Sequence, residues 1–155
     1  MELFVKANAE ILAHNATPST YVLSHNKYSD WTDSEFKRLL GHKHTSDPSN
    51  YLRLPIESEH RPVDWVSAGA VTPVKDQGSC GSCWTFSATG GLEGANFVKS
   101  GKLLSFSEQQ LVDCSTEGEN AGCGGGMSYD AYTYYQTHSA MTESAYPYTA
   151  VDGTC

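Results

Sequence analysis

The cysteines are the feature that most limits what this chain can fold into. All of them lie in the second half of the 155-residue chain, at positions 80, 83, 114, 123 and 155. Four paired cysteines with one left over are typical of a protein that folds in an oxidising compartment and keeps one functional thiol. The first residues, however, show no basic segment followed by an apolar one, so no signal peptide is predicted here. We therefore expect the true N-terminus to be missing from this sequence.

Composition excludes several classes of function. Charged residues make up 18% of the chain and hydrophobic residues 39%, which indicates a globular protein rather than a disordered one. The net charge of −8 argues against nucleic acid as a partner, because phosphate binding needs clustered lysines and arginines. No window approaches the roughly 18 consecutive apolar residues of a membrane span, so none is predicted.

The thiol at position 83 stands where a loop should become a helix. The pattern of apolar residues predicts a helix over 83–99 and shorter ones over 107–114 and 127–136. Unpaired N–H groups and the macrodipole at a helix N-terminus stabilise a thiolate, which makes Cys83 a candidate nucleophile. Gln77 offers a side-chain amide that can donate to a developing oxyanion beside the backbone N–H of Cys83. In this first helix the side chains suited to burial are Trp84, Ala88, Leu92, Ala95 and Val98.

Two other uses of the cysteines compete with this interpretation. Cys80 and Cys83 are spaced as a redox pair, but a thioredoxin-like pair would need a βαβ context, and none is predicted before them. A zinc site would need a second close pair of ligands, whereas Cys114 and Cys123 are nine residues apart with no histidine between them. Both alternatives are therefore disfavoured, and we predict neither a metal nor a cofactor.

The segment from Gln77 to Trp84 contains the pattern C-G-[SA]-C-[WY], and it resembles the signature of papain-family, cathepsin-like cysteine peptidases. Three further segments resemble the mature N-terminal region of the same family: 63–65, 69–75 and 107–109. The resemblance implies an α+β, papain-like cysteine proteinase fold, truncated here to a partial helical propeptide and the mainly helical left domain. It also implies a cysteine endopeptidase precursor in which Cys83 is the nucleophile and Gln77 forms the oxyanion hole.

The resemblance extends to the other cysteines and to a run of glycines. It implies disulfides between Cys80 and Cys123 and between Cys114 and Cys155, which leaves Cys83 free. It further implies that the substrate backbone lies along Gly125 and Gly126, and that Met127 helps form the subsite for an apolar side chain. Trp84 is also expected to contribute to substrate binding. A glycine lets another backbone approach closely because it has no Cβ. Taken without the resemblance, Met127 is predicted to be a core residue.

The first third of the chain is predicted to be helical in two places. Apolar residues fall along one face of residues 2–15, and Thr32 with Glu35 three residues later fits a capping box that begins a second helix, which Gly41 ends. Between these helices, residues 21–28 alternate in part and predict a short strand. Residues 42–62 are rich in polar residues and prolines, which is typical of an extended linker.

These elements resemble a cathepsin-L-type propeptide that lacks its first part. The likeness is carried by Phe4, Ala7, Ile11 and Asn15 in the first helix and by the spacing from Ser24 to Phe36, with departures at positions 7, 24 and 28. It implies a propeptide inhibitor-like region at 1–57 and the left-domain half of a peptidase at 58–155. Processing is expected near Ser58 to His60. Asn15-Ala16-Thr17 is also a candidate glycosylation site.

The sequence also lacks something that cysteine proteolysis needs. An imidazole must lie beside the thiol, and in this family the histidine and asparagine follow the nucleophile by about 130–150 residues, which is beyond residue 155. We therefore predict that this chain is inactive alone, and that its full-length parent is a lysosomal or secreted peptidase. The parent's partners would be peptide or protein substrates and its own propeptide as an intramolecular inhibitor.

The alternative function is regulation. A propeptide-like inhibitor or a pseudoenzyme could control related cysteine peptidases without any catalysis of its own. An inhibitor would have no need of an intact Gln77 and Cys83, so the peptidase hypothesis is favoured.

Overall fold

A computed structural model describes residues 1–43 and 62–155, which form two compact units, Met1–Leu39 and Leu40–Cys155. The predicted domain boundary between residues 57 and 58 lies outside the described residues, and so do the processing point near Ser58 to His60 and most of the predicted linker.

The first unit contains the two predicted helices. Helix α1 spans Glu2–Asn15, and helix α2 spans Asp33–Phe36 and continues as a 3-10 turn, η1, over Lys37–Leu39. The predicted capping box is confirmed. The hydroxyl of Thr32 accepts from the backbone N–H of Glu35, and the Glu35 carboxylate accepts from that of Thr32.

The predicted strand over residues 21–28 is wrong, because no strand forms anywhere in residues 1–43. The backbone there pairs with a side chain instead of with a neighbouring strand. The Asn15 amide nitrogen donates to the carbonyl oxygen of Leu23 at 2.8 Å, and the Asn15 oxygen accepts from the Leu23 N–H at 2.8 Å.

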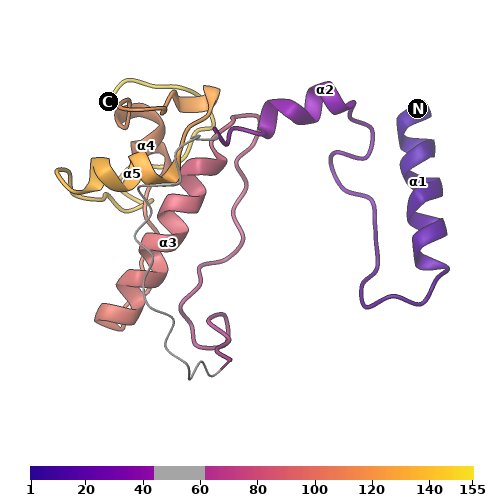
Figure 1. Ribbon diagram of the computed structural model, residues 1–155, viewed down its shortest axis with the longest axis horizontal. Coiled ribbons are helices and arrows are strands. Elements are labelled where there is room, and N and C mark those ends of the chain that lie inside the picture. The colour runs from indigo at the N-terminus through magenta and orange to yellow at the C-terminus, as the bar shows by residue number, and fades with distance from the viewer. Residues whose placement is uncertain (44–61) are drawn as a thin grey trace, which may run out of the picture. The chain divides into compact units, whose positions relative to one another are not determined.

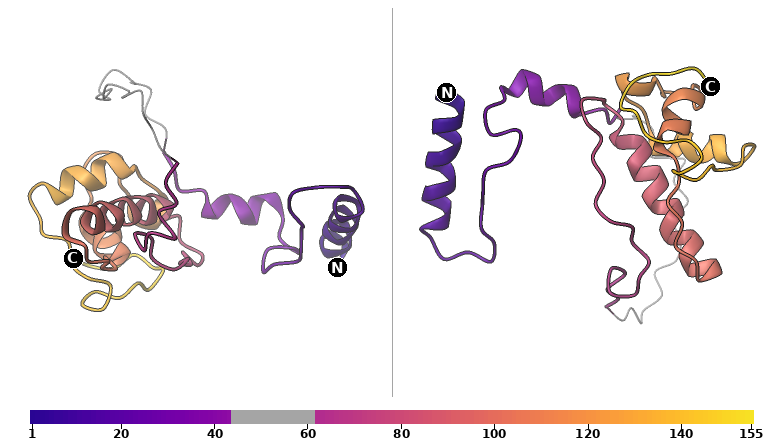
Figure 2. Two further views of the ribbon diagram at one scale, coloured as in Figure 1. Left: turned by 90° about the horizontal axis from the view of Figure 1, so that it is seen from below. Right: turned by 180° about the vertical axis from the view of Figure 1, so that it is seen from behind.

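The second unit is built on the helix that begins at the candidate nucleophile. Helix α3 spans Cys83–Ser100, α4 spans Glu108–Cys114 and α5 spans Ser128–Tyr135, so all three predicted helices are confirmed within two residues at each end. Helices α4 and α5 both pack against α3, as the separate views of Figures 1 and 2 show. A short 3-10 turn, η3, covers Gly122–Gly124.

Extended backbone contributes little to the part of the chain that is described. It makes two isolated bridges, between His42 and Gly126 and between Phe106 and Thr142, and no strand longer than that. This agrees with the predicted helical portion of a papain-like fold. No helix among the described residues has both the length and the apolar character needed to cross a membrane.

The core lies where the first half of α3 meets α4 and α5. Its fully buried apolar side chains are Trp84 and Ala88 from α3, Leu111 from α4 and Ala131 from α5. Trp84 and Ala88 are therefore buried as predicted, whereas the prediction for Ala95 and Val98 is wrong, since both are exposed. The far end of α3 extends beyond α4 and α5 in Figure 1, so neither of these two helices covers it.

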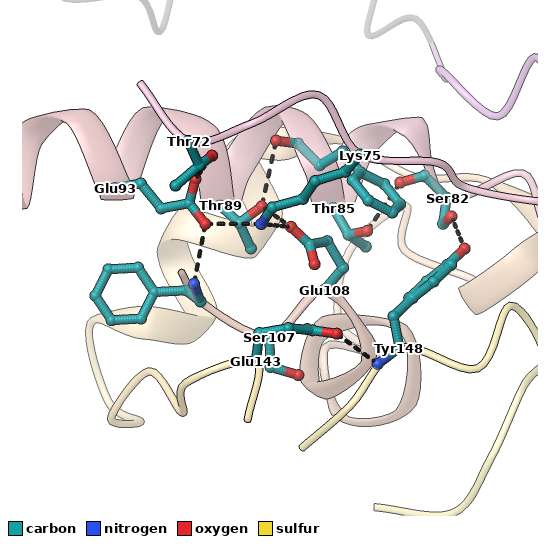
Figure 3. A network of polar contacts seen from close by, with 12 residues as sticks. Thr72, Lys75, Ser82, Thr85, Thr89, Glu93, Ser107, Glu108, Glu143 and Tyr148 are labelled. Carbon is teal, nitrogen blue, oxygen red and sulfur yellow. Dashed lines mark hydrogen bonds and ion pairs between the residues drawn. The ribbon is translucent and has the colours of Figure 1, made fainter. Parts of the chain in front are cut away.

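The buried face of α3 includes a polar stripe that the sequence analysis did not predict. Thr85, Thr89 and Glu93 follow one another at four-residue spacing, and each is at most 1% exposed. The Lys75 ammonium forms an ion pair with Glu93 at 2.8 Å and a second one with Glu108 of α4 at 2.6 Å (Figure 3). Burial alone would lower the pKa of Lys75, but the hydrogen bonds to Glu108 and Glu93 outweigh it and raise that pKa. Lys75 is therefore held as a cation between two buried carboxylates.

Further donors reach both carboxylates. The hydroxyl of Thr72 donates to Glu93 at 2.7 Å, and the backbone N–H of Phe106 donates to the same side chain at 2.9 Å. The hydroxyl of Thr89 donates to Glu108 at 2.6 Å. This network ties the segment before Cys83 to α3 and α4.

Replacing Lys75 by methionine should destabilise the second unit strongly. The substitution leaves two buried carboxylates without their shared cation, so the free energy of unfolding should fall by about 3–5 kcal/mol. Denaturant unfolding followed by tryptophan fluorescence measures this change. Lys102→Met at an exposed position is the matched control and should change stability little. Equal effects of the two substitutions would contradict the role given to the network.

Candidate active site

The candidate nucleophile lies beside two loops that are joined by a disulfide. Cys80 and Cys123 are bonded, and the N–H of Gly81 donates to the carbonyl oxygen of Cys123 at 3.0 Å. A second disulfide joins Cys114 at the end of α4 to Cys155. Both pairs are those that the family pattern implies. All five cysteines are described, and Cys83 alone among them is unpaired.

Cys83 is the first residue of α3 and is half-buried. The N-terminus of a helix presents unpaired N–H groups that favour negative charge on a nearby sulfur. Gln77 precedes it in the same turn, and its amide nitrogen donates to the carbonyl oxygen of Cys80 at 2.8 Å. The structure thus brings the predicted nucleophile and the predicted oxyanion donor into one short loop, whose conformation the Cys80 disulfide restricts.

The glycines at 125 and 126 form an edge of backbone over the core. A Cβ on Gly126 would lie 2.3 Å from the Asn120 side-chain oxygen and 2.9 Å from the ring of Trp84, so only glycine fits. Trp84 is 1% exposed, and its ring nitrogen donates to the carbonyl oxygen of Gly122 at 3.1 Å. The Trp84 ring therefore packs against the core-facing side of this edge. Met127, at 8% exposure, is also largely buried.

A short segment of the chain lies along this edge. The carbonyl oxygen of Gly41 accepts from the N–H of Gly126 at 2.8 Å, and the N–H of Lys43 donates to the carbonyl oxygen of Gly126 at 3.2 Å. Between them, His42 forms a parallel bridge with Gly126. The Lys43 ammonium then donates to the carbonyl oxygen of Glu119 at 2.7 Å. The segment 40–43 thus pairs with the edge as an added strand would.

This approach depends on the absence of a side chain at position 41. A Cβ there would lie 1.7 Å from the carbonyl oxygen of Gly81. Gly41 was predicted only as the end of a helix, so the sequence analysis missed its close contact with Gly81. The glycine itself was the available signal, because a glycine often marks a place where another backbone approaches closely.

No imidazole is hydrogen-bonded to the free thiol of Cys83 within the described residues. No hydrogen bond there joins Cys83 to a histidine: His42 bridges Gly126, and His138 stacks on Tyr134 with 4.2 Å between ring centroids. Across residues 1–43 and 62–155, no group of three or more potential metal ligands is assembled either.

Comparison with known proteins agrees with this geometry. Residues 60–155 match the family model described as papain family cysteine protease. The chain belongs to the papain family. It is 42% identical to a cathepsin L-like peptidase of Aedes aegypti, covering all of this chain and 51% of that protein. It is 48% identical to digestive cysteine proteinase 1 of Homarus americanus, covering 88% of this chain and 44% of that protein.

Solved structures of the family have the same fold. Digestive procathepsin L2 from Tenebrio molitor larval midgut superposes with a TM-score of 0.86 at 36% identity, over 99% of this chain and 54% of that one. A recombinant stem bromelain precursor gives a TM-score of 0.83 at 29% identity, over 99% of this chain and 51% of that one. The chain spans about half the length of the curated relatives it matches.

One partly buried carboxyl of the second unit lacks a full set of hydrogen-bond partners. Glu143 accepts from the backbone N–H of Tyr148 at 2.8 Å through one oxygen, while its other oxygen is buried with no hydrogen-bond partner. Burial raises the pKa of Glu143, and the charge of Glu108 adds to this effect, while Tyr148 and Lys75 oppose it. Sequence analysis gave no sign of this group.

Glu143 should make stability depend on pH. Because its folded pKa lies above its unfolded one, Glu143 takes up a proton on folding. Its contribution to stability is therefore complete below the unfolded pKa, about 4.3, and is lost as pH rises through the folded pKa. In thermal unfolding, the wild type should lose stability relative to Glu143→Gln as the pH rises above about 4. The control Glu117→Gln, at an exposed position, should follow the wild type, and parallel profiles for all three would contradict the assignment.

Replacing Gly41 by alanine should release the segment 40–43 from Gly126. The added Cβ would meet the Gly81 carbonyl, so the hydrogen bond from the Gly126 N–H to Gly41 would be lost. Hydrogen exchange at Gly126 should become at least about tenfold faster, since two backbone hydrogen bonds open together. Gly90→Ala, where nothing lies within 4 Å of the new atom, should leave that rate unchanged. Undiminished protection in the Gly41 variant would show that the pairing is not required.

Proposed function

We propose that the chain is the nucleophile-bearing part of a papain-family cysteine endopeptidase precursor. The observation that carries the proposal is Cys83, which is unpaired, half-buried and first in α3. Gln77 lies in the same turn, held by the carbonyl of Cys80. Membership of the family does not by itself establish peptidase chemistry. The proposal therefore rests on Cys83 and Gln77 lying at the same turn.

The chemistry follows from this geometry. The Cys83 thiolate attacks the carbonyl carbon of a peptide bond, and the Gln77 amide and the Cys83 N–H stabilise the oxyanion that forms. The C–N bond then breaks, and an imidazole gives its proton to the leaving amine. Water hydrolyses the remaining thioester and restores the thiol. The imidazole and its orienting asparagine would come from the region that follows the nucleophile by about 130–150 residues in this family.

Substrate is proposed to lie along Gly125 and Gly126. The pairing of residues 40–43 with Gly126 supports this, because it uses the backbone groups that an extended peptide would use. Met127, next in the chain, is proposed to border the subsite for an apolar side chain, where an adaptable thioether suits varied partners. Trp84 acts beneath the glycines rather than at the surface.

Residues 1–57 are proposed to be the propeptide and 58–155 the left-domain half of the peptidase. The segment 40–43 then occupies the cleft as an intramolecular inhibitor. The same contacts argue against an inhibitor of other enzymes as the main function, because the segment already binds an edge within its own chain. The parent is proposed to act in lysosomes or outside the cell, where the two disulfides are stable.

Asn15 remains a proposed glycosylation site, with a structural cost. Its amide nitrogen already donates to the carbonyl oxygen of Leu23. A sugar on that nitrogen would replace one of its hydrogens, so glycosylation would compete with the contact that closes the first unit.

The 155-residue chain alone should not turn over a peptide substrate. After incubation with an epoxide inactivator selective for activated papain-type thiols, intact mass should show no adduct, whereas iodoacetamide should label Cys83 once. The variant Cys83→Ala should take up neither reagent. Epoxide labelling of Cys83 together with peptide hydrolysis would mean that a base is present within these residues, and would refute the inactivity.

A further inference from the structure

The hydroxyl group of Tyr148 bridges the two ends of the turn that leads into α3. It donates to the carbonyl oxygen of Gln77 at 2.8 Å, and it lies 2.5 Å from the hydroxyl oxygen of Ser82. A tyrosine has a single hydroxyl hydrogen, and Gln77 receives it, so Ser82 must donate in the second contact. Figure 3 shows the Ser82 and Tyr148 side chains pointing toward each other. One oxygen atom therefore connects the residue with the oxyanion amide to the residue before the nucleophile.

The Ser82 hydroxyl bonds Tyr148 although Ser82 occupies the N-cap position of α3. It is the N-cap of α3, where a serine hydroxyl commonly accepts from a backbone N–H of the first turn, yet it makes no such bond. Its side chain is fully buried and is directed to Tyr148 instead. Only its carbonyl oxygen bonds the first turn, accepting from the N–H and the hydroxyl of Thr85 at 2.8 Å each and from the N–H of Phe86 at 3.4 Å. The Ser82 side chain at the start of α3 is therefore held by Tyr148, which lies outside the helix.

Tyr148 is itself fixed by groups from α3, from α4 and from the segment that precedes it. Its N–H donates to Glu143 at 2.8 Å, and its ring packs edge-on against Phe86 of α3 with 5.0 Å between centroids. The next residue, Thr149, donates its N–H to Gln109 of α4 at 2.9 Å. Burial raises the pKa of Tyr148, and the charges of Glu108 and Asp76 add to this against the effect of Ser82, so the phenol keeps its hydrogen.

We propose that Tyr148 is a positioning residue for the nucleophile. It acts through Gln77 and Ser82, by keeping the oxyanion amide and the start of α3 at a fixed separation. The proposal rests on the proposed function only in giving Cys83 the role of nucleophile. Without the hydroxyl, the first turn of α3 would loosen, and its N–H groups would stabilise the Cys83 thiolate less well.

The test is the pH dependence of Cys83 alkylation by iodoacetamide in Tyr148→Phe. Phenylalanine keeps the ring against Phe86 and removes only the bridging oxygen. At about pH 6.5 the rate should fall by roughly threefold to tenfold, which is the effect of losing one or two net hydrogen bonds. On the alkaline plateau, where the thiol is fully ionised, the rate should equal that of the wild type. A general loss of structure would change the plateau too, so the ratio of the two rates separates positioning from folding.

Tyr146→Phe is the matched control, because it removes a hydroxyl from the same segment that bonds Asp113 instead of the turn. It should leave the rate ratio unchanged. Ser82→Ala removes the other partner of the bridge and should reproduce the Tyr148→Phe profile, which keeps the test decisive if one variant folds poorly. A wild-type ratio in both Tyr148→Phe and Ser82→Ala would overturn the proposal, and so would an equal shift in Tyr146→Phe. Because alkylation needs no peptide turnover, these results stand whether or not the parent proves to be a peptidase.

Discussion

Lys75 provides the interaction on which the second unit depends most. Its single ammonium is shared by Glu93 and Glu108, which come from different helices and are 2% and 1% exposed. Two carboxylates at this depth require both a cation and hydrogen bonds, because either charge left unpaired would cost several kcal/mol. Lys75 comes from the extended segment that leads into the Gln77 turn. The contact that supplies a cation to both carboxylates therefore also fixes where the turn starts, while the Cys80–Cys123 disulfide ties the turn to η3.

The edge formed by Gly125 and Gly126 shows a second constraint, which is steric rather than electrostatic. Gly126 lies directly on Trp84, and Gly41 lies directly against Gly81, so backbone meets backbone or ring where a side chain would not fit. Such close approach lets the segment 40–43 satisfy both the N–H and the carbonyl of Gly126. The edge is thus built to pair with an extended chain, and in this precursor the chain itself supplies one. Inhibition and substrate binding would then use the same backbone groups.

The helices and the thiol could be predicted from sequence because their signals are local. Thr32 and Glu35 form a capping box within four residues, and the turn before Cys83 carries a family signature. The polar stripe on α3 could not be predicted, since Glu93 is buried only because Lys75 and the Phe106 N–H reach it from other segments. Tyr148 likewise gains its role from Gln77 and Ser82, which lie 71 and 66 residues away in sequence. The strand predicted over 21–28 does not form, because the Asn15 side chain bonds the backbone of Leu23 in place of a neighbouring strand. The alternation of apolar residues carries no information about such a contact.

We propose that these residues carry the nucleophile of a cysteine peptidase whose imidazole comes from the C-terminal portion of the family's fold. The most direct test is a fusion of residues 1–155 to the remaining C-terminal portion of the Aedes aegypti cathepsin L-like peptidase, which this chain matches at 42% identity. After acid treatment to release the propeptide, the account predicts hydrolysis of a fluorogenic peptide by the fusion and none by its Cys83→Ala variant. A fusion with both disulfides formed and a native-like circular dichroism spectrum, but without Cys83-dependent hydrolysis, would contradict the claim.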